Sequence, residues 1–340
     1  MENMSMGRQS FVLQDPPVIT SWASVAGKKE KVGPLGYCFD ATHNDAYFGE
    51  KTWEQGEKRM QQMALEILAE KAGMKPSDFG VVFSGDLLNQ CIATTFGFRQ
   101  LGIPFLGLYG ACSTMGQTLA MAALFVDSGA ADLCGAVTSS HFCTAERQFR
   151  YPLEYGGQRT PTAQWTATCA GACLLECGGD APAYVHAVTF GRVKDYGVTD
   201  INNMGAAMAP AAYDTLSAHF RETGRTPADY NLIVTGDLGQ IGKELLMDLA
   251  RKDGLSLGGK LTDCGTLVFD NTVQDVHAGG SGCGCSAITL CGELLGKLNS
   301  GKLKKILFCG TGALLSPTST QQGLPIPGVC HAVVITGGRE

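Results

Sequence analysis

Cys112 stands where an apolar run gives way to a run of helix-forming residues. Residues 104–109 are typical of a short strand, Gly110 and Ala111 allow a sharp turn, and residues 113–127 favour a helix. The unpaired N–H groups and the dipole at a helix start favour a thiolate over a thiol and can hold an oxyanion beside the sulfur. Cys112 is therefore a candidate nucleophile. The alternative is that Cys112 is simply one small buried residue among the 14 cysteines of the chain.

The composition narrows the class of protein. The 340 residues carry a formal net charge of −6 and no basic run, which argues against a nucleic-acid partner. Residues 1–8 lack the order of a signal peptide. No charge occurs between Gln100 and Asp127, but the glycines and Pro104 there favour a fully buried strand and helix over a membrane span. We therefore expect a soluble protein.

The cysteines do not follow the spacing of a disulfide scaffold or of a zinc site. Cys169, Cys173 and Cys177 are spaced by four, and the glycines around them favour a strand. A strand spreads alternate residues too far apart for tetrahedral metal coordination. We expect free thiols in a reducing cytosol, with no bound metal and no cofactor.

The elements before Cys112 have clear local signals. We expect a first strand over Val18–Ala26 and then a long glycine-rich, charged loop to Gly49. Residues 53–72 place apolar side chains at helical spacing and stop at Gly73. Pro76 then starts a turn that leads into an apolar strand ending near Asp86.

The chain contains an internal repeat. Residues 227–237 (Pro-Ala-Asp-Tyr-Asn-Leu-Ile-Val-Thr-Gly-Asp) repeat the pattern of residues 76–86 at an offset of 151, and a glycine-terminated helix precedes each copy. A second uncharged turn and helix begin near Gly280, which places Cys283 opposite Cys112. We therefore expect an α/β protein with two similar halves, residues 1–190 and 191–340, packed around a pseudo-twofold axis.

A duplicated α/β chain with a cysteine at this turn resembles the thiolase and ketoacyl-synthase superfamily over nearly its whole length. The resemblance implies a five-layer αβαβα fold. A closer resemblance, to the stage V sporulation protein AD family of spore-forming bacteria, rests on three stretches. These are residues 109–117 (Tyr-Gly-Ala-Cys-Ser-Thr-Met-Gly-Gln), 138–152 (Thr-Ser-Ser-His-Phe-Cys-Thr-Ala-Glu-Arg-Gln-Phe-Arg-Tyr-Pro) and 275–282 (Asp-Val-His-Ala-Gly-Gly-Ser-Gly).

That closer resemblance implies a homodimer that binds pyridine-2,6-dicarboxylate (dipicolinic acid). It implies that the ligand binds either free or with calcium, and that calcium, where it is present, enters only as a chelate with this ligand. It further implies a role in loading the compound into the developing spore, together with other stage V sporulation A membrane proteins. The implied location is the cytoplasmic side of the forespore or spore inner membrane, with peripheral attachment.

The departures from the superfamily pattern favour a binding protein over an enzyme. Active condensing enzymes carry a histidine on the loop that here reads Gly-Asp237-Leu-Gly-Gln, and one branch carries asparagine where this chain has Ser281. Without that base, proton transfer and oxyanion support are lost, each worth on the order of 10²–10³ in rate. The alternative is a cysteine-dependent acyltransferase of the ketoacyl-synthase III type, with Cys112 as nucleophile and His277, in a His-Ala-Gly-Gly loop, as base. In a third interpretation the pocket is vestigial and the protein is a scaffold.

The predicted ligand site combines anion-binding groups from both halves of the chain. Arginine forks grip carboxylates in bidentate fashion, so the segment that carries Arg147 and Arg150 suits a planar dianion. His141 and His277 have the alternative of being hydrogen-bonded loop residues, and the arginines have the alternative of facing solvent or a dimer mate. The full predicted set is Cys112, His141, Arg147, Arg150, Asp237, Ser281, Thr311 and Gly312.

Overall fold

Ten strands form one continuous hydrogen-bonded path in the computed structural model, which describes residues 6–149 and 158–338. The order along the sheet is β5-β4-β6-β8-β2-β9-β14-β13-β10-β11. The first five are β5 (Phe105–Gly107), β4 (Val81–Gly85), β6 (Leu133–Ser140), β8 (Cys169–Glu176) and β2 (Val18–Ala26). The second five are β9 (Ala183–Phe190), β14 (Gly328–Thr336), β13 (Lys305–Ala313), β10 (Leu232–Thr235) and β11 (Leu261–Asp263).

This order is symmetric about the β2–β9 junction. Each half has two antiparallel strands at the junction and parallel strands beyond them, so β4 and β10 occupy equivalent places. β4 begins at Val81 and β10 at Leu232, and the offset is the 151 residues of the sequence repeat. By strand order, β9 is the counterpart of β2. The division at residue 190 stays a prediction.

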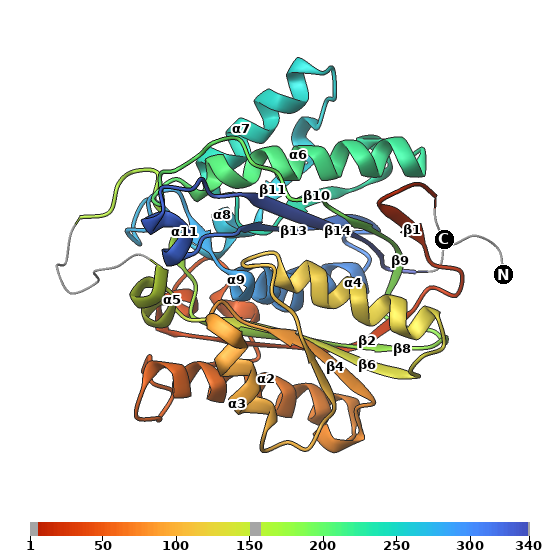
Figure 1. Cartoon of the computed structure of the whole chain (residues 1–340). Coiled ribbons are helices and arrows are strands. Elements are labelled where there is room, and N and C mark those ends of the chain that lie inside the picture. The colour runs from red at the N-terminus through yellow and green to blue at the C-terminus, as the bar shows by residue number, and fades with distance from the viewer. Residues whose placement is uncertain (1–5, 150–157, 339–340) are drawn as a thin grey trace.

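Helices separate and cover the two halves of the sheet. Figure 1 shows α4 and α9 between them, α2 and α3 on one outer face, and α6 and α7 on the other. The long helices are α2 (Trp53–Ala72), α4 (Thr114–Asp127), α6 (Met204–Thr223) and α7 (Gly239–Lys252). The shorter ones are α1 (Lys28–Lys31), α3 (Ile92–Phe98), α5 (Phe142–Phe149), α8 (Cys264–Val268), α9 (Cys283–Thr289), α10 (Leu295–Asn299) and α11 (Pro317–Gln321). The arrangement is the expected five-layer αβαβα stack.

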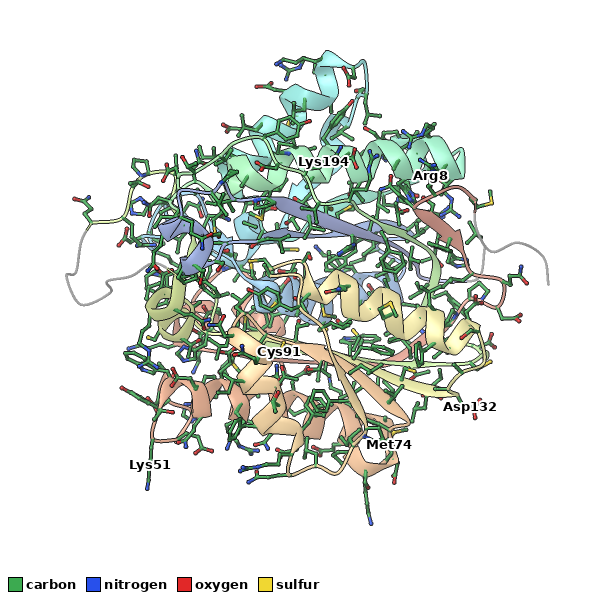
Figure 2. All side chains as sticks on the ribbon, in the orientation of Figure 1. Arg8, Lys51, Met74, Cys91, Asp132 and Lys194 are labelled. Atoms are coloured by element: carbon green, nitrogen blue, oxygen red, sulfur yellow. The ribbon has the colours of Figure 1, made fainter. Side chains whose placement is uncertain are left out.

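The central layer forms the main apolar core. Met115, Leu119 and Ala123 of α4 pack with Ile288 and Leu290 from the α9 region. A π-helical turn, Leu290–Leu294, joins α9 to α10. Side chains fill the space between the layers, and charged side chains such as those of Lys51 and Asp132 lie at the periphery (Figure 2). The absence of charge between Gln100 and Asp127 therefore reflects the position of α4 in the middle of the molecule.

Several predicted elements are confirmed. β2 and α2 have the predicted bounds, and Gly73 ends α2 in the left-handed conformation, with φ of 68°. The prediction of a fully buried strand at residues 104–109 is wrong: β5 has only three residues at one end of the sheet, and Leu106 is 46% exposed. Local composition does not reveal which strand ends a sheet.

Short elements near the N-terminus were not predicted. β1 (Ser10–Val12) pairs with β9, and β3 (Ala41–Thr42) pairs with β2 inside the segment that was expected to be a loop.

A separate two-stranded ribbon joins β7 (Trp165–Thr166) to β12 (Gly280–Ser281). This ribbon brings the segment after α5 beside the start of α9, and it forms one wall of the site described below.

Candidate functional site

Cys112 lies in a turn that local hydrogen bonds hold against α4. Ala111 has a φ of 51°, a left-handed conformation that alanine rarely adopts. The Thr114 hydroxyl donates to the Ala111 carbonyl at 2.6 Å and accepts from the Gly110 N–H at 3.1 Å. β13 passes so close that a Cβ on Gly312 would lie 2.4 Å from the Gly110 carbonyl oxygen. Gly312 therefore allows the second half to pack directly against the Cys112 turn.

A polar chain from the second half reaches the Cys112 sulfur. The sulfur lies 3.7 Å from the Ser281 hydroxyl oxygen. Ser281 in turn donates to Asp237 Oδ2 at 2.9 Å, so its oxygen is available to accept from the Cys112 thiol. The Gly282 N–H donates to the same carboxylate oxygen at 3.0 Å, and the Thr311 hydroxyl donates to Oδ1 at 2.8 Å. Four of the predicted site residues, Cys112, Ser281, Asp237 and Thr311, are thus brought together.

This environment keeps Cys112 protonated. Burial raises the pKa of the Cys112 thiol well above its usual range, and the nearby Asp237 carboxylate raises it further. Burial also raises the pKa of Asp237. The prediction that the helix start favours a thiolate is therefore wrong, because desolvation and a neighbouring carboxyl outweigh the α4 dipole.

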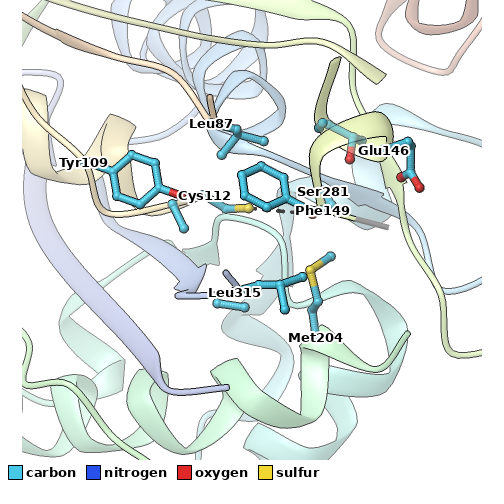
Figure 3. A pocket seen from close by; sticks show the side chains of 12 residues that line it. Leu87, Tyr109, Cys112, Glu146, Phe149, Met204, Ser281 and Leu315 are labelled. Atoms are coloured by element: carbon cyan, nitrogen blue, oxygen red, sulfur yellow. Dashed lines mark hydrogen bonds between the residues drawn. The ribbon is translucent and has the colours of Figure 1, made fainter. Parts of the chain in front are cut away.

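A narrow pocket, with a cavity volume of about 30 Å³, opens at Cys112 (Figure 3). In this view the Tyr109 ring lies to the left of the sulfur and the Phe149 ring next to it, with Leu87 above and Met204 and Leu315 below. Burial raises the pKa of Tyr109, so its hydroxyl stays a donor. The lining is Leu87, Tyr109, Ala111, Cys112, Ala145, Glu146, Phe149, Thr166, Met204, Ser281, Ala313 and Leu315. The pocket is mostly apolar, with hydroxyl and thiol donors and one carboxyl group.

The two predicted histidines do not line this pocket. His141 Nε2 lies 2.7 Å from the Ala46 carbonyl, and Nδ1 accepts from the Cys143 N–H, so the ring has both nitrogens engaged. Burial lowers the pKa of His141, which keeps the ring neutral. His277 Nε2 lies 3.3 Å from Asp275 Oδ1. A role for either ring in ligand binding or catalysis stays a prediction.

The predicted arginines also contribute nothing to the described lining. Arg147 is half-exposed, pairs with Glu54 and lies over the Trp53 ring, 5.3 Å from its centroid. Arg150 lies outside the described residues. Arg147 therefore faces α2, away from the ring of residues around Cys112.

The described residues contain no group of three or more His, Cys, Asp or Glu side chains arranged for a metal ion. All 14 cysteines are free thiols. Within residues 6–149 and 158–338, no helix combines the length and the apolar character needed to cross a membrane.

Comparison with known proteins identifies the family. The family model described as Stage V sporulation protein AD (SpoVAD) matches residues 7–336. A Bacillus subtilis (strain 168) protein named stage V sporulation protein AD is 44% identical over 329 residues, which cover 96% of each chain. The chain belongs to the stage V sporulation protein AD family.

Solved structures extend the similarity to the fold. An acetyl-CoA acetyltransferase from Syntrophomonas wolfei superposes with a TM-score of 0.61 at 9% identity and covers 95% of this chain and 99% of its own. A 3-oxoacyl-(acyl-carrier-protein) synthase III from Aquifex aeolicus gives 0.55 at 13% identity, with 94% and 99% coverage. At these identities the likeness shows the fold alone. The thiolase-like fold of this stage V sporulation protein AD family member is therefore confirmed.

Sequence reasoning missed most of the pocket wall in this family member. Tyr109, Glu146 and Phe149 lay within the quoted stretches but were not singled out. Met204 and Leu315 come from distant segments and carry no local signal.

A buried pair, Glu57 and Asp86, was also missed. Glu57 accepts from Thr144 of α5 at 2.8 Å and from Ser139 of β6 at 3.0 Å, so it anchors the helix that supplies Phe149.

Proposed function

We propose that this protein takes part in sporulation by binding dipicolinic acid, free or as its calcium chelate, in the Cys112 pocket during uptake into the developing spore. Membership of the stage V sporulation protein AD family supports the sporulation role. The observation that carries the binding role is a pocket in which Ser281 and Asp237, and no imidazole among the described lining residues, stand beside Cys112. Such a site holds a ligand without transforming it.

The pocket chemistry suits a planar aromatic acid. The Tyr109 and Phe149 rings in the lining offer stacking surfaces. The Tyr109 hydroxyl, the Cys112 thiol and the Thr166 hydroxyl are neutral donors for carboxylate oxygens. Because a neutral donor keeps its proton at neutral pH, these contacts persist across the physiological range.

Glu146 favours the calcium chelate over the free dianion. The Glu146 carboxyl group lines the pocket, and the calcium chelate, unlike the free dianion, carries no net charge. Calcium accepts additional oxygen ligands readily, and a carboxylate is one of its preferred ligands. We therefore propose that the chelate binds more tightly than the free acid.

Calorimetry tests the binding role. Dipicolinate should bind the parent protein, more tightly with equimolar calcium, and Phe149→Ala should weaken binding at least about tenfold because a stacking surface and an apolar wall are lost. Phe96→Ala is the matched control, since Phe96 is an exposed phenylalanine outside this pocket. Absence of heat with the parent protein, with and without calcium, would refute the proposal.

A second candidate function is acyl transfer through Cys112. The apolar side chains of Leu87, Met204 and Leu315 around the sulfur support it, because they suit an acyl chain. Incubation with acyl-CoA of several chain lengths, followed by mass spectrometry, should show a Cys112 adduct if this function holds. An unmodified Cys112 at every chain length would exclude it.

Homodimerisation and contact with other stage V sporulation A membrane proteins at the spore inner membrane are part of the same proposal. The outer edge of β5, whose central residue Leu106 is exposed, supports a dimer because unpaired strand edges pair readily. Sedimentation equilibrium should give a dimer for the parent protein and a monomer for Leu106→Lys. A monomeric parent protein would remove the dimer from the proposal.

A further inference from the structure

Two cations share one face of the Trp165 indole. Lys29 Nζ lies 3.7 Å from the ring centroid, and the Arg159 guanidinium carbon lies 4.8 Å from it. The Phe142 ring stacks on the indole with centroids 3.6 Å apart and planes 8° apart. Since Phe142 occupies one face, both cations lie on the other. Two positive charges are thus held close together at the surface of a protein whose net charge is −6.

These cations are incompletely paired. Among the described residues no ion pair joins Lys29 to a carboxylate, and Arg159 Nη1 is buried without a hydrogen-bond partner. Arg159 Nη2 does contact Asp275, at 3.4 Å from Oδ2 and also through the Asp275 backbone carbonyl. Burial, and after it the repulsion from Arg159, lower the pKa of Lys29, while the Asp275 and Glu30 carboxyl groups offset part of that decrease. An oxyanion beside the two cations would relieve that repulsion.

The cations lie behind the wall of the Cys112 pocket. Thr166 and Ser281 are paired in the β7–β12 ribbon, and both line the pocket. Trp165 precedes Thr166 in the same strand and does not line the pocket, and successive strand residues point to opposite faces. Ligands on the two faces of the ribbon would therefore contact adjacent residues.

We propose that Lys29 and Arg159, held on the Trp165 indole, form a second ligand site that binds an oxyanion, either a carboxylate or a phosphate group, on the face of the β7–β12 ribbon opposite Cys112. The two cations supply charge-assisted donors, and the indole fixes their positions. The site does not depend on the proposed dipicolinate pocket. His277, held by Asp275, stands beside Arg159 on the rim of this second site.

Protection of Lys29 from acetylation tests the site. The parent protein is treated with acetic anhydride at constant ionic strength, and peptide mass spectrometry compares Lys29 with its exposed neighbour Lys28 as internal control. The probes are dipicolinate, isophthalate and inorganic phosphate, with sodium chloride as the screening control. A saturable decrease of at least about fivefold at Lys29 alone is expected from a carboxylate or from phosphate, and the effective probe identifies the source of the oxyanion.

Two variants complete the test. Arg159→Met should abolish the protection, because the shared anion loses one of its two cations, whereas Arg147→Met keeps it. Phe149→Ala should leave Lys29 protection intact even where calorimetry shows loss of pocket binding, which separates this site from the Cys112 pocket. Equal protection by chloride, no protection at tens of millimolar probe, or protection that persists in Arg159→Met would each overturn the inference.

Discussion

The two copies of the turn before a central helix differ in what they expose. In each copy a residue with positive φ precedes the cysteine: Ala111, with φ of 51°, before Cys112, and Gly282, with φ of 105°, before Cys283. Cys112 lines a pocket, whereas Cys283 is fully buried and donates to the Ser139 carbonyl at 3.0 Å. Both turns therefore contribute to the pocket, the first through Cys112 and the second through Ser281, but only the first turn presents its cysteine there.

The aspartates of the repeat differ in the same way. Asp86 and Asp237 are separated by the repeat offset of 151. Asp86 accepts from the Leu88 N–H and from Thr94 within its own half. Asp237 accepts from Ser281 and Thr311 and so reaches Cys112 of the other half. Asp86 therefore stabilises a loop of its own half, whereas Asp237 helps to form the pocket around Cys112 of the other half.

We call the turn of Ala111 and Cys112 the open turn and the turn of Gly282 and Cys283 the closed turn. The largest effect is expected at the closed turn. Gly282→Ala should destabilise the protein by about 3 kcal/mol or more, because alanine does not adopt this conformation and its Cβ would lie 2.5 Å from Ser140 Oγ. Urea unfolding followed by circular dichroism measures the change. Gly296→Ala is the control, since a Cβ there meets nothing within 4 Å. Equal stability of the two variants would show that the closed turn is not constrained.

A second test removes the carboxylate that distinguishes the open turn. Asp237→Asn should lower the pKa of Cys112, because the neighbouring negative charge is lost while most hydrogen bonds survive. Iodoacetamide alkylation of Cys112 at pH 8, followed by mass spectrometry, should become at least about tenfold faster. Asp86→Asn is the matched control from the other half and should leave the rate unchanged. The comparison fails if both variants behave alike.

The same Asp237 should matter for stability. Asp237→Ala leaves the Ser281 and Thr311 hydroxyls and the Gly282 N–H without their acceptor, which should cost about 2–3 kcal/mol. Urea unfolding of this variant beside Asp237→Asn separates lost hydrogen bonds from lost charge. A fully stable Asp237→Ala would mean that the polar chain to Cys112 contributes little to folding.

The sequence predicted those structural features whose determinants lie close together in the chain. The bounds of α2 depend on helical periodicity and on Gly73, both visible in the sequence, and the repeat offset is visible by comparing residues 76–86 with residues 227–237. The thiolate prediction failed because the pKa of Cys112 depends on burial and on Asp237, which is 125 residues away in the sequence. The side chains of Met204 and Leu315 line the pocket beside Cys112 only after the two halves pack together. The sequence therefore predicted local structure, but it did not predict the environment of Cys112.

A pH test addresses the carboxyl groups of the first half. Burial, with a contribution from Asp86, raises the pKa of Glu57 from 4.5 to about 8. Since the folded state then holds a proton that the unfolded state releases, this group makes stability fall as pH rises from about 4.5 to about 8. Glu57→Gln should reduce that fall by on the order of 2 kcal/mol in urea unfolding between pH 5 and pH 8.

The control for this measurement is Glu66→Gln, because Glu66 lies on the same helix but is exposed and pairs with Arg59 at the surface. Its pH profile should match that of the parent protein. A Glu57→Gln profile that also matches the parent would mean that Glu57 is ionised in the folded state. Protonation of Glu57 would then not contribute to the contacts that hold α5 beside the pocket.

The smallest effect is expected at the open turn. Ala111→Gly should stabilise the protein by up to about 1 kcal/mol in urea unfolding, because glycine adopts a positive φ without a steric penalty, although its more flexible unfolded state offsets part of the gain. The Ala111 side chain lines the pocket, so the same variant should bind dipicolinate more weakly than the parent protein. A more stable but weaker binder would mean that strain is retained at the open turn because the methyl group shapes the ligand site. Gly282 has no such conflict, because it does not itself line the pocket.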